Sequence, residues 1–534
     1  MSKIENRARE NSPSMPEEVH ERGEGLKSWV ASCLLPATLL LTPTSCLWAA
    51  NPVDGVGEAY GAQFDAADGV QAPASRVPRP SKDTAQRLLY WNEVAINASG
   101  LDHTPVAPGD QRVFGEQIGP ARSSRAMAIV HIAMFDAANA VSGKYTSYSP
   151  GVTQQGNTSV DAAVAQAAHD TLIAMYPSQK LAFDKALTDD LAKLDNNLAR
   201  QRGIELGRRS AAAILATRAN DGSDFKEPVV GVDFTPSNQP GKWRPDPVSQ
   251  IPLALGLHWG KVKPFASEAI RSYRLPPPPS MKSAEYTVAF NELKRLGGDG
   301  VSTPTIRTED QGVAGRYWAY DGMPSLCAPP RLYNQVAVHI AKQQGTANSY
   351  IDLARLLVLV NVTMADAGTA AWDNKWYYQH WRPVTGLREA DPGTGPTGLG
   401  DGNPATRGDP DFMPLGAPAD NIKGPNFSPP FPSYPSGHAT IGGALFETLR
   451  QFYGTDNIAF SFVSDEYNGL TVDNTGNIRP LEVRSFSTLS QAEEENGQSR
   501  IYLGIHWAFD KTQGISLGRR ISRYVFRHAF LRAD

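Results

Sequence analysis

Residues 350–381 read YIDLARLLVLVNVTMADAGTAAWDNKWYYQHW. Apolar side chains recur here at intervals of three and four residues, which places them on the same side of an α-helix. Charged residues interrupt the run, and no stretch beyond the first 50 residues reaches the roughly 18 uninterrupted apolar residues that indicate a membrane span. The stretch therefore predicts a long helix in the body of a soluble protein.

The same helical spacing appears in both halves of the chain. It covers residues 125–141, 160–176, 183–194 and 202–220, and it returns at 334–344, after Ser436 and after Phe509. Few stretches alternate in the manner of a β-strand. These patterns predict an all-α protein made of two helical bundles with long Pro/Gly-rich connecting loops.

We expect one all-helical domain over residues 84–534. Its first bundle covers about residues 84–225, and its second, which carries the motifs described below, covers about 331–534. About residues 226–330 form a connector between them, because segments such as QPGKWRPDP and PPPP contain too much proline for regular helix.

The first 50 residues predict a leader. An apolar run, WVASCLLPATLLL, covers residues 29–41 and is followed by the small residues Ala49 and Ala50. This pattern is typical of a signal peptide and predicts export to the periplasm or the medium. The alternative is a single membrane anchor, so we expect membrane contact only if the leader is not cleaved. Residues 51–83, rich in Gly, Ala, Asp and Pro, predict a flexible linker.

Composition limits the function classes. The chain has 534 residues, 41% of them hydrophobic, and a formal net charge of −4. This is enough apolar material for a large core, and it does not predict the basic surface that a nucleic-acid partner requires. Beyond the leader the chain has one cysteine, Cys327, so no internal disulfide is expected in the cleaved protein.

A first motif pairs two cations. In KWYYQHWRP, Lys375 and Arg382 are seven residues apart, which predicts that both lie on one helix face, two turns from each other. Pro383 is expected to end that helix at Arg382. Two cations on one face point to an anion-binding pocket, although a solvated basic face is the plainer alternative.

A second motif lies in PPFPSYPSGHATIGGA, residues 429–444. Ser436, Gly437 and His438 directly precede a run with helical spacing. A helix N-terminus presents unpaired N–H groups to an oxyanion, and glycine lets the backbone approach it closely. The plainer alternative is an ordinary serine N-cap followed by a surface histidine.

A third motif, SRIYLGIHWAFD, supplies Arg500, His506 and Asp510. The spacing from His506 to Asp510 allows the carboxylate to hold one imidazole nitrogen on a helix or helical turn. The other nitrogen is then free to act as a ligand or a nucleophile. A structural histidine bonded to a nearby aspartate is the alternative.

Together, the three motifs resemble the superfamily that joins vanadium-dependent haloperoxidases to histidine acid phosphatases and lipid phosphatases. YWAYDG (317–322) and APPRLYNQVA (328–337) are similar to the chloroperoxidase-like members. The resemblance implies a vanadate cofactor, without haem, flavin or nicotinamide. It also implies that hydrogen peroxide oxidises a halide, bromide and possibly chloride, to hypohalous acid.

The same resemblance implies the roles of individual residues. Vanadate would be held by Lys375, Arg382, Ser436, Gly437 and Arg500. His506 would bind vanadium, with Asp510 supporting it, while Lys375 and His438 would be catalytic, His438 as the acid–base group.

Two aromatic residues resemble a halide pocket in the family. Trp372 matches an aromatic of fungal chloroperoxidases, and Phe431 occupies a position where algal bromoperoxidases carry histidine. Core packing is the plainer reading of both. Asp310 and Asp321 are both candidates for the carboxylate that supports Arg500.

Two other functions use the same residues. An acid phosphatase would form a phosphohistidine on His506 while His438 protonates the leaving group. A non-catalytic oxyanion-binding protein would keep the pocket without turnover.

Overall fold

The computed structural model describes residues 83–533, apart from 268, 323–324, 419–425 and 474. The predicted leader, residues 1–50, and all but the last residue of the predicted linker, 51–83, lie outside the described residues.

Five helices form the first half of the described chain. They are α2 (Thr84–Asp102), α3 (Gly119–Ser142), α4 (Val160–Met175), α5 (Lys180–Leu191) and α6 (Leu198–Arg218). Helix α4 packs against α3 and α6. The α4–α6 contact is close because Gly203 and Gly207 lie where a Cβ atom would come within 2.5 Å of a backbone carbonyl of Ser159 or Ala163.

Two helices lie inside the predicted connector. They are α7 (Ala284–Leu296) and α8 (Glu309–Tyr317), and each begins after a side-chain N-cap, Ser283 and Thr308 respectively. These helices lie among the proline-rich segments that led us to predict a connector without regular helix. Four 3₁₀ turns connect longer elements: η1 (Pro177–Gln179), η2 (Trp259–Lys261), η3 (Ile270–Tyr273) and η4 (Thr346–Asn348).

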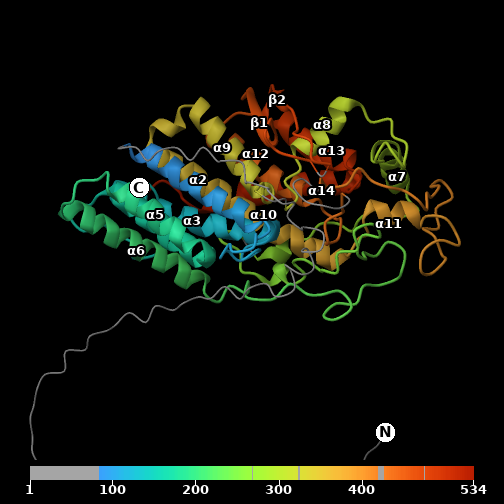
Figure 1. Cartoon of the computed structure of the whole chain (residues 1–534), viewed down its shortest axis with the longest axis horizontal. Coiled ribbons are helices and arrows are strands. Elements are labelled where there is room, and N and C mark those ends of the chain that lie inside the picture. The colour runs from blue at the N-terminus through green and yellow to red at the C-terminus, as the bar shows by residue number, and fades with distance from the viewer. Residues whose placement is uncertain (1–82, 268, 323–324, 419–425, 474, 534) are drawn as a thin grey trace, which may run out of the picture. The chain divides into compact units, whose positions relative to one another are not determined.

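Six helices form the second half. They are α9 (Pro329–Gln343), α10 (Tyr350–Tyr378), α11 (Pro383–Arg388), α12 (Gly437–Tyr453), α13 (Leu489–Tyr502) and α14 (Ala508–His528). In Figure 1, α10 lies between α3, α5 and α6 on the left and α13 and α14 on the right. Helix α10 is apolar and long enough to cross a membrane, but its most apolar window is 94% buried inside the protein. It is therefore a core helix.

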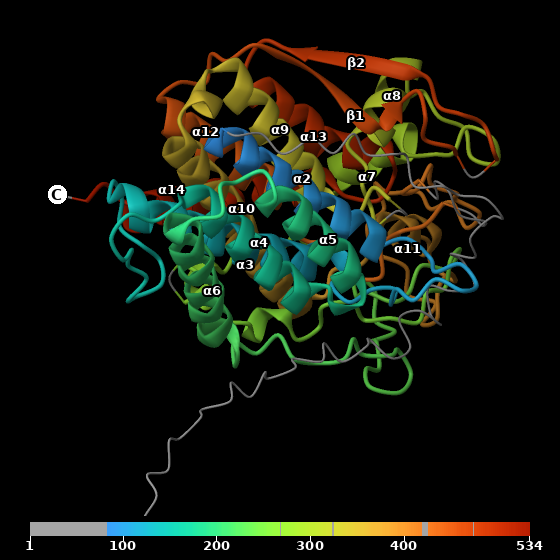
Figure 2. The ribbon, with the colours of Figure 1, turned by 60° about the vertical axis from the view of Figure 1, so that its left-hand side comes forward.

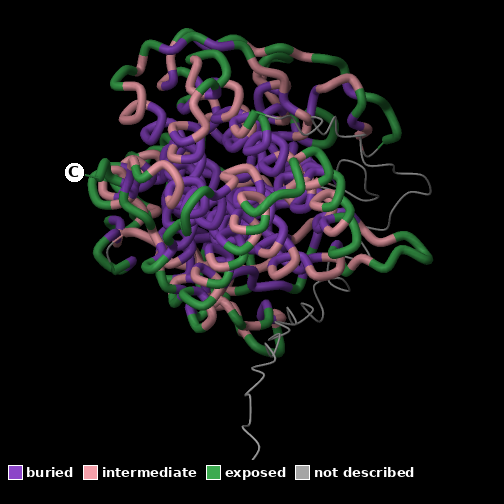
Figure 3. The backbone as a smooth tube through the Cα atoms, turned by 90° about the vertical axis from the view of Figure 1, so that its left-hand side faces the viewer, coloured by how far each residue is buried: buried purple, intermediate pink, exposed green. Residues whose placement is uncertain are grey.

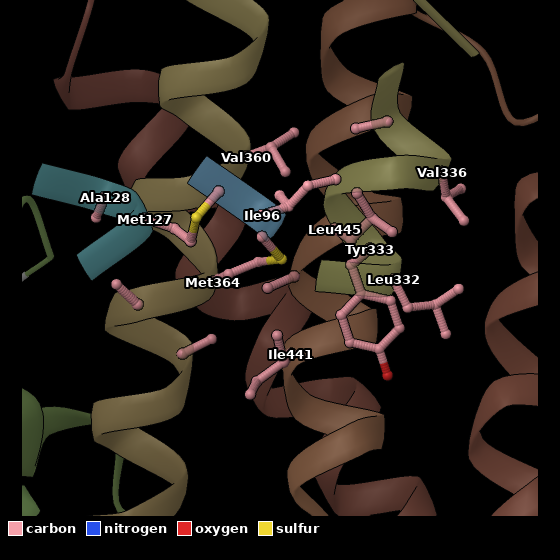
Figure 4. Packing of buried hydrophobic residues seen from close by; sticks show 14 of the residues in the cluster. Ile96, Met127, Ala128, Leu332, Tyr333, Val336, Val360, Met364, Ile441 and Leu445 are labelled. Carbon is pink, nitrogen blue, oxygen red and sulfur yellow. The ribbon is translucent and has the colours of Figure 1, made fainter. Parts of the chain in front are cut away.

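The core surrounds α10. Figure 3 shows the buried backbone gathered in the interior. Figure 4 shows side chains of α2, α3, α9, α10 and α12 meeting there, with Met364 of α10 facing Ile441 of α12. Because apolar surface is removed from water on every side of α10, this helix holds the two halves together.

One two-stranded antiparallel sheet is present in the described residues. Its strands are β1 (Phe460–Asn468) and β2 (Leu481–Phe486), with Val463 opposite Val483. Figure 2 shows this hairpin at the top of the view, beside α8. The fold class is all-α, as the sequence predicts, with this hairpin as an addition that the helical patterns did not indicate.

Candidate active site

Lys375 lies in the last turn of α10 and is fully buried. Its ammonium group donates to the carbonyl oxygens of Pro432, at 2.8 Å, and Ser433, at 2.9 Å. Two of its three N–H groups thus donate to carbonyl oxygens, and this fixes the direction of the third N–H group. Burial holds the Lys375 pKa well below its usual value, and the charge of Arg382 lowers it further.

Arg382 does not share a helix face with Lys375, so that prediction was wrong. Helix α10 ends at Tyr378, and Gln379 turns the chain with a φ of 51°. Arg382 is instead the N-cap of α11, in an extended conformation, with Pro383 in the first turn. Proline disfavours helical geometry in the residue before it and is well suited to begin a helix, so Pro383 starts a helix here.

The contacts of Arg382 determine the state of His506. Arg382 donates through Nη1 to the His506 Nε2 atom at 3.0 Å. Because a guanidinium can only donate, His506 Nε2 accepts and its lone pair lies on that nitrogen. The other nitrogen, Nδ1, therefore carries the proton and donates it to Asp510 at 2.9 Å.

Asp510 is fully buried at the start of α14 and also accepts the Trp507 backbone N–H at 3.0 Å. Burial raises the pKa of Asp510, and its N–H donors and the nearby cations oppose that shift. Burial and Arg382 hold the pKa of His506 well below its usual value, so its imidazole is neutral, as a metal ligand or nucleophile must be.

Arg500 lies near the end of α13 and binds Asp321. Its Nη2 atom donates to both carboxylate oxygens, at 2.8 and 2.6 Å. The buried Nε and Nη1 atoms of Arg500 have no hydrogen-bond partner among the described residues. Of the two candidate carboxylates the structure selects Asp321, since Asp310 is an exposed partner of Arg484.

Ser436 is the N-cap of α12, and its Oγ accepts the Ala439 N–H at 3.3 Å. The first amides of α12, at Gly437 and His438, have no intrahelical acceptor, as at every helix start. Gly437 and His438 both line a buried cavity together with Arg500 and His506. The helix start therefore faces the same space as Arg500 and His506.

His438 is oriented by a backbone carbonyl. Its Nε2 atom lies 2.5 Å from the Ala319 oxygen, and because a carbonyl only accepts, Nε2 carries the proton. The Nδ1 atom is then the proton acceptor of the ring. Burial, together with the charge of Arg500, holds the His438 pKa well below its usual value, so the imidazole is neutral.

Trp372 and Phe431 form an apolar wall of the cavity. Their ring centroids are 4.9 Å apart. The Phe431 centroid lies 5.1 Å from Lys375 Nζ and 4.9 Å from Arg382 Cζ. The two rings therefore shield two cations from water on one side, and their contact with the cavity suits the predicted halide pocket.

Sequence reasoning missed the carbonyl groups that hold Arg382 and His438. The oxygens of Phe431 and Ile505 accept from Arg382, and that of Ala319 accepts from His438. Any residue supplies a carbonyl, so no sequence signal marks these positions. Leu255, which lines the cavity and accepts the Trp372 indole N–H at 3.2 Å, was also missed.

An oxyanion such as vanadate fits these residues. Three buried cations, Lys375, Arg382 and Arg500, face two buried carboxylates, Asp321 and Asp510, which leaves an excess of positive charge. The uncommitted N–H groups of Arg500 and the start of α12 supply donors. The Nε2 lone pair of His506 accepts from Arg382 here, and it would bind vanadium once Arg382 donates to the oxyanion instead.

Comparisons with known proteins identify the family of this chain. The family model described as the VCPO second helical-bundle domain matches residues 355–533. Vanadium chloroperoxidase of Curvularia inaequalis is 32% identical over 516 residues, covering 82% of this chain and 81% of the relative. The chain belongs to the vanadium-dependent haloperoxidase family. It is accordingly an enzyme with a vanadate cofactor.

Two more haloperoxidases are similar to the chain. The vanadium-dependent bromoperoxidase of Ascophyllum nodosum is 34% identical over 99 residues, which is 18% of this chain and 17% of the relative. The crystal structure of the first bacterial vanadium-dependent iodoperoxidase superimposes with a TM-score of 0.65 at 21% identity. That match covers 84% of this chain and 98% of the other, and it shows a shared vanadium-dependent haloperoxidase fold.

Proposed function

We propose that this enzyme uses hydrogen peroxide to oxidise bromide, with chloride as a second substrate, to hypohalous acid. The observation that carries the proposal is the meeting of Arg500, His506 and the start of α12 at one cavity. The buried cations Lys375 and Arg382 lie beside the Phe431 ring, which lines the same cavity. Relatives named for chloride and bromide support the choice of halides.

Five residues would hold vanadate. Lys375, Arg382 and Arg500 would neutralise its negative charge, and Ser436 and the Gly437 N–H would donate to it. Charge-assisted hydrogen bonds are strong where water is excluded, and all three cations are at most 1% exposed. His506 would bind vanadium through Nε2, while Asp510 keeps the proton on Nδ1. When bound, vanadate would supply vanadium as a Lewis acid that activates hydrogen peroxide, and the oxidation state of vanadium would not change.

The remaining chemistry is proton transfer and exclusion of water. The neutral His438 ring donates its Nε2 proton in a hydrogen bond to the Ala319 carbonyl, so Nδ1 would accept a proton from incoming peroxide. The Lys375 ammonium, 5.1 Å from the centroid of the cavity-lining Phe431 ring, would add positive charge beside the cavity. Trp372 and Phe431 keep water from the cations, which strengthens their effect on developing negative charge.

A paired assay on the full chain tests the proposal. The protein is loaded with orthovanadate and assayed for halogenation of a diketone with hydrogen peroxide and bromide, and then chloride. The vanadate-free protein is assayed in parallel for hydrolysis of an aryl phosphate. We expect vanadate-dependent halogenation that is lost in His506→Ala. Hydrolysis through a phosphohistidine, with no vanadate-dependent halogenation, would favour the phosphatase alternative and overturn the proposal.

A further inference from the structure

Three consecutive residues orient two of the candidate site residues. The Ala319 carbonyl accepts from His438, and the Asp321 carboxylate binds Arg500. Between them, Tyr320 is fully buried and has a φ of 42°. A positive φ is unfavourable for a tyrosine, and such a conformation persists only where its surroundings hold it in place.

Strand β1 supplies those surroundings. The Ser464 hydroxyl donates to the Tyr317 carbonyl at 2.7 Å, just before the turn. The Asp465 backbone N–H donates to the Tyr320 hydroxyl at 2.8 Å. The Glu466 carboxylate accepts the Tyr320 backbone N–H at 2.9 Å. The hairpin, which contributes no cavity-lining residue among those described, is thus bonded along the back of the turn.

Glu466 is the charged member of this contact. It is fully buried, and its second carboxylate oxygen accepts from Arg479 Nη1 at 3.0 Å. One oxygen therefore holds the central amide of the turn, and the other is anchored to the hairpin itself. A buried carboxylate that is bonded on both oxygens has a defined position, and it transmits that position to the amide that it holds.

We propose that Glu466 is a positioning residue for both Arg500 and His438. By fixing the Tyr320 amide, it sets the Ala319 carbonyl and the Asp321 carboxylate on either side, and these orient the His438 ring and the Arg500 guanidinium. Its loss releases both at once, although it touches neither. The inference rests on the proposed function, because Arg500 and His438 are the groups that would bind the oxyanion and move the proton.

The test compares Glu466→Ala with Glu466→Gln in the full chain. Binding of orthovanadate to the vanadate-free protein is measured by titration calorimetry, and kcat and the bromide KM are measured on the loaded enzyme. We expect Glu466→Ala to weaken orthovanadate binding by roughly tenfold or more and to lower kcat, as loss of outer supporting residues does at other metal sites. Glu466→Gln keeps an oxygen that can accept the Tyr320 N–H, and it should retain most of the affinity.

Asp465→Ala is the matched control. Asp465 is the preceding residue of the same strand, and its carboxylate binds Arg331 and Gln335. Among the described residues it reaches the turn only through Gln335, which accepts from the Tyr320 hydroxyl at 3.3 Å and not from the turn's backbone. This variant loses an ion pair of the hairpin but keeps the Glu466 contact. It should bind orthovanadate as the unmodified protein does.

The proposal would be overturned if Glu466→Ala left the orthovanadate affinity and kcat unchanged. It would also be overturned if Asp465→Ala or Glu466→Gln lost as much orthovanadate affinity as Glu466→Ala does. If Glu466→Ala does not fold, Glu466→Asp replaces it, because the shorter side chain keeps the charge and withdraws the acceptor. If the proposed function is wrong, the unmodified protein would bind orthovanadate without oxidising bromide. The orthovanadate affinities of the Glu466 variants would still decide the role of Glu466.

Discussion

Arg500 gives only one nitrogen, Nη2, to Asp321, and this nitrogen lies 2.6 and 2.8 Å from the two carboxylate oxygens. The pairing leaves Nε and Nη1 buried without a partner among the residues that the structure describes. An unpaired buried donor is costly, so a site that keeps two of them is preorganised for an incoming acceptor. Asp321 holds the guanidinium in place, and the other two nitrogens remain for the oxyanion.

Arg500→Lys should show how much of the orthovanadate affinity depends on the geometry of the Arg500 guanidinium and how much on its charge. A lysine ammonium keeps the charge, but it cannot hold Asp321 and also present two fixed N–H groups. We expect orthovanadate affinity to fall by roughly tenfold, which is about 1.4 kcal/mol, in titration calorimetry. Arg484→Lys is the control, because Arg484 also pairs with an aspartate, the exposed Asp310, but lies outside the cavity lining. Equal affinity in the two variants would contradict the role of Arg500.

Asp510 supports His506 through a single oxygen. His506 Nδ1 and the Trp507 N–H both donate to Oδ2. Asp510→Asn can place its amide oxygen at the same point, so it should keep the tautomer of His506 and most of the orthovanadate affinity. Asp510→Ala removes the acceptor, and we expect a loss of roughly 10- to 100-fold in orthovanadate affinity. An equal loss in both variants would show that charge, and not orientation, is what Asp510 supplies.

The lowered pKa of Lys375 predicts that anion binding takes up a proton. Burial and Arg382 depress this pKa in the empty site, and an oxyanion beside the ammonium should raise it again. At a pH between the Lys375 pKa of the empty site and that of the occupied site, Lys375 gains a proton when the oxyanion binds. The oxyanion affinity should therefore fall as the pH rises through that window. Below the depressed pKa no uptake is expected.

Tungstate is a suitable probe for this uptake, because it carries no proton of its own near neutral pH. Calorimetry in buffers that differ in ionisation enthalpy measures the protons taken up, and Lys375→Met should abolish the uptake. A pH-independent tungstate affinity up to the ordinary pKa of lysine would rule the prediction out.

Phe431→His should change the choice of halide. The Phe431 ring covers Lys375 and Arg382, and a polar ring there would admit water and screen both charges. Chloride is harder to oxidise than bromide, so chloride turnover should fall further, and the ratio of kcat/KM for bromide to that for chloride should rise. Phe431→Leu stays apolar and should keep the ratio close to its original value. A ratio that is unchanged in Phe431→His would remove Phe431 from the halide pocket.

Much of the helical architecture was predictable from local pattern. The run at 350–381 became α10, which covers Tyr350–Tyr378, and the pattern after Ser436 became α12, which begins at Gly437. Such patterns are reliable for long helices because the same side chains that define them are the ones that pack in the core. Helices α7 and α8 were missed, since the proline-rich segments around them predicted an irregular connector.

The positions of the cations were less predictable. Seven-residue spacing suggested one helix face for Lys375 and Arg382, but the turn at Gln379 separates them into two elements. Both still lie beside the Phe431 ring, which lines the cavity. The carbonyls after Phe431 hold Lys375 there, and those of Phe431 and Ile505 hold Arg382. Side-chain spacing along one helix contains no information about such carbonyls.

The sequence by itself determined the all-α class, the long central helix and the residue types of an oxyanion site, because helical periodicity and motif chemistry are local properties of the chain. Tertiary structure alone decided that Asp321 and not Asp310 binds Arg500, that the lone pair of His506 lies on Nε2, and that Glu466 of a β-hairpin supports the turn behind the site. Each of these depends on which buried donor meets which acceptor across more than a hundred residues of chain, and only the packed fold brings those partners together.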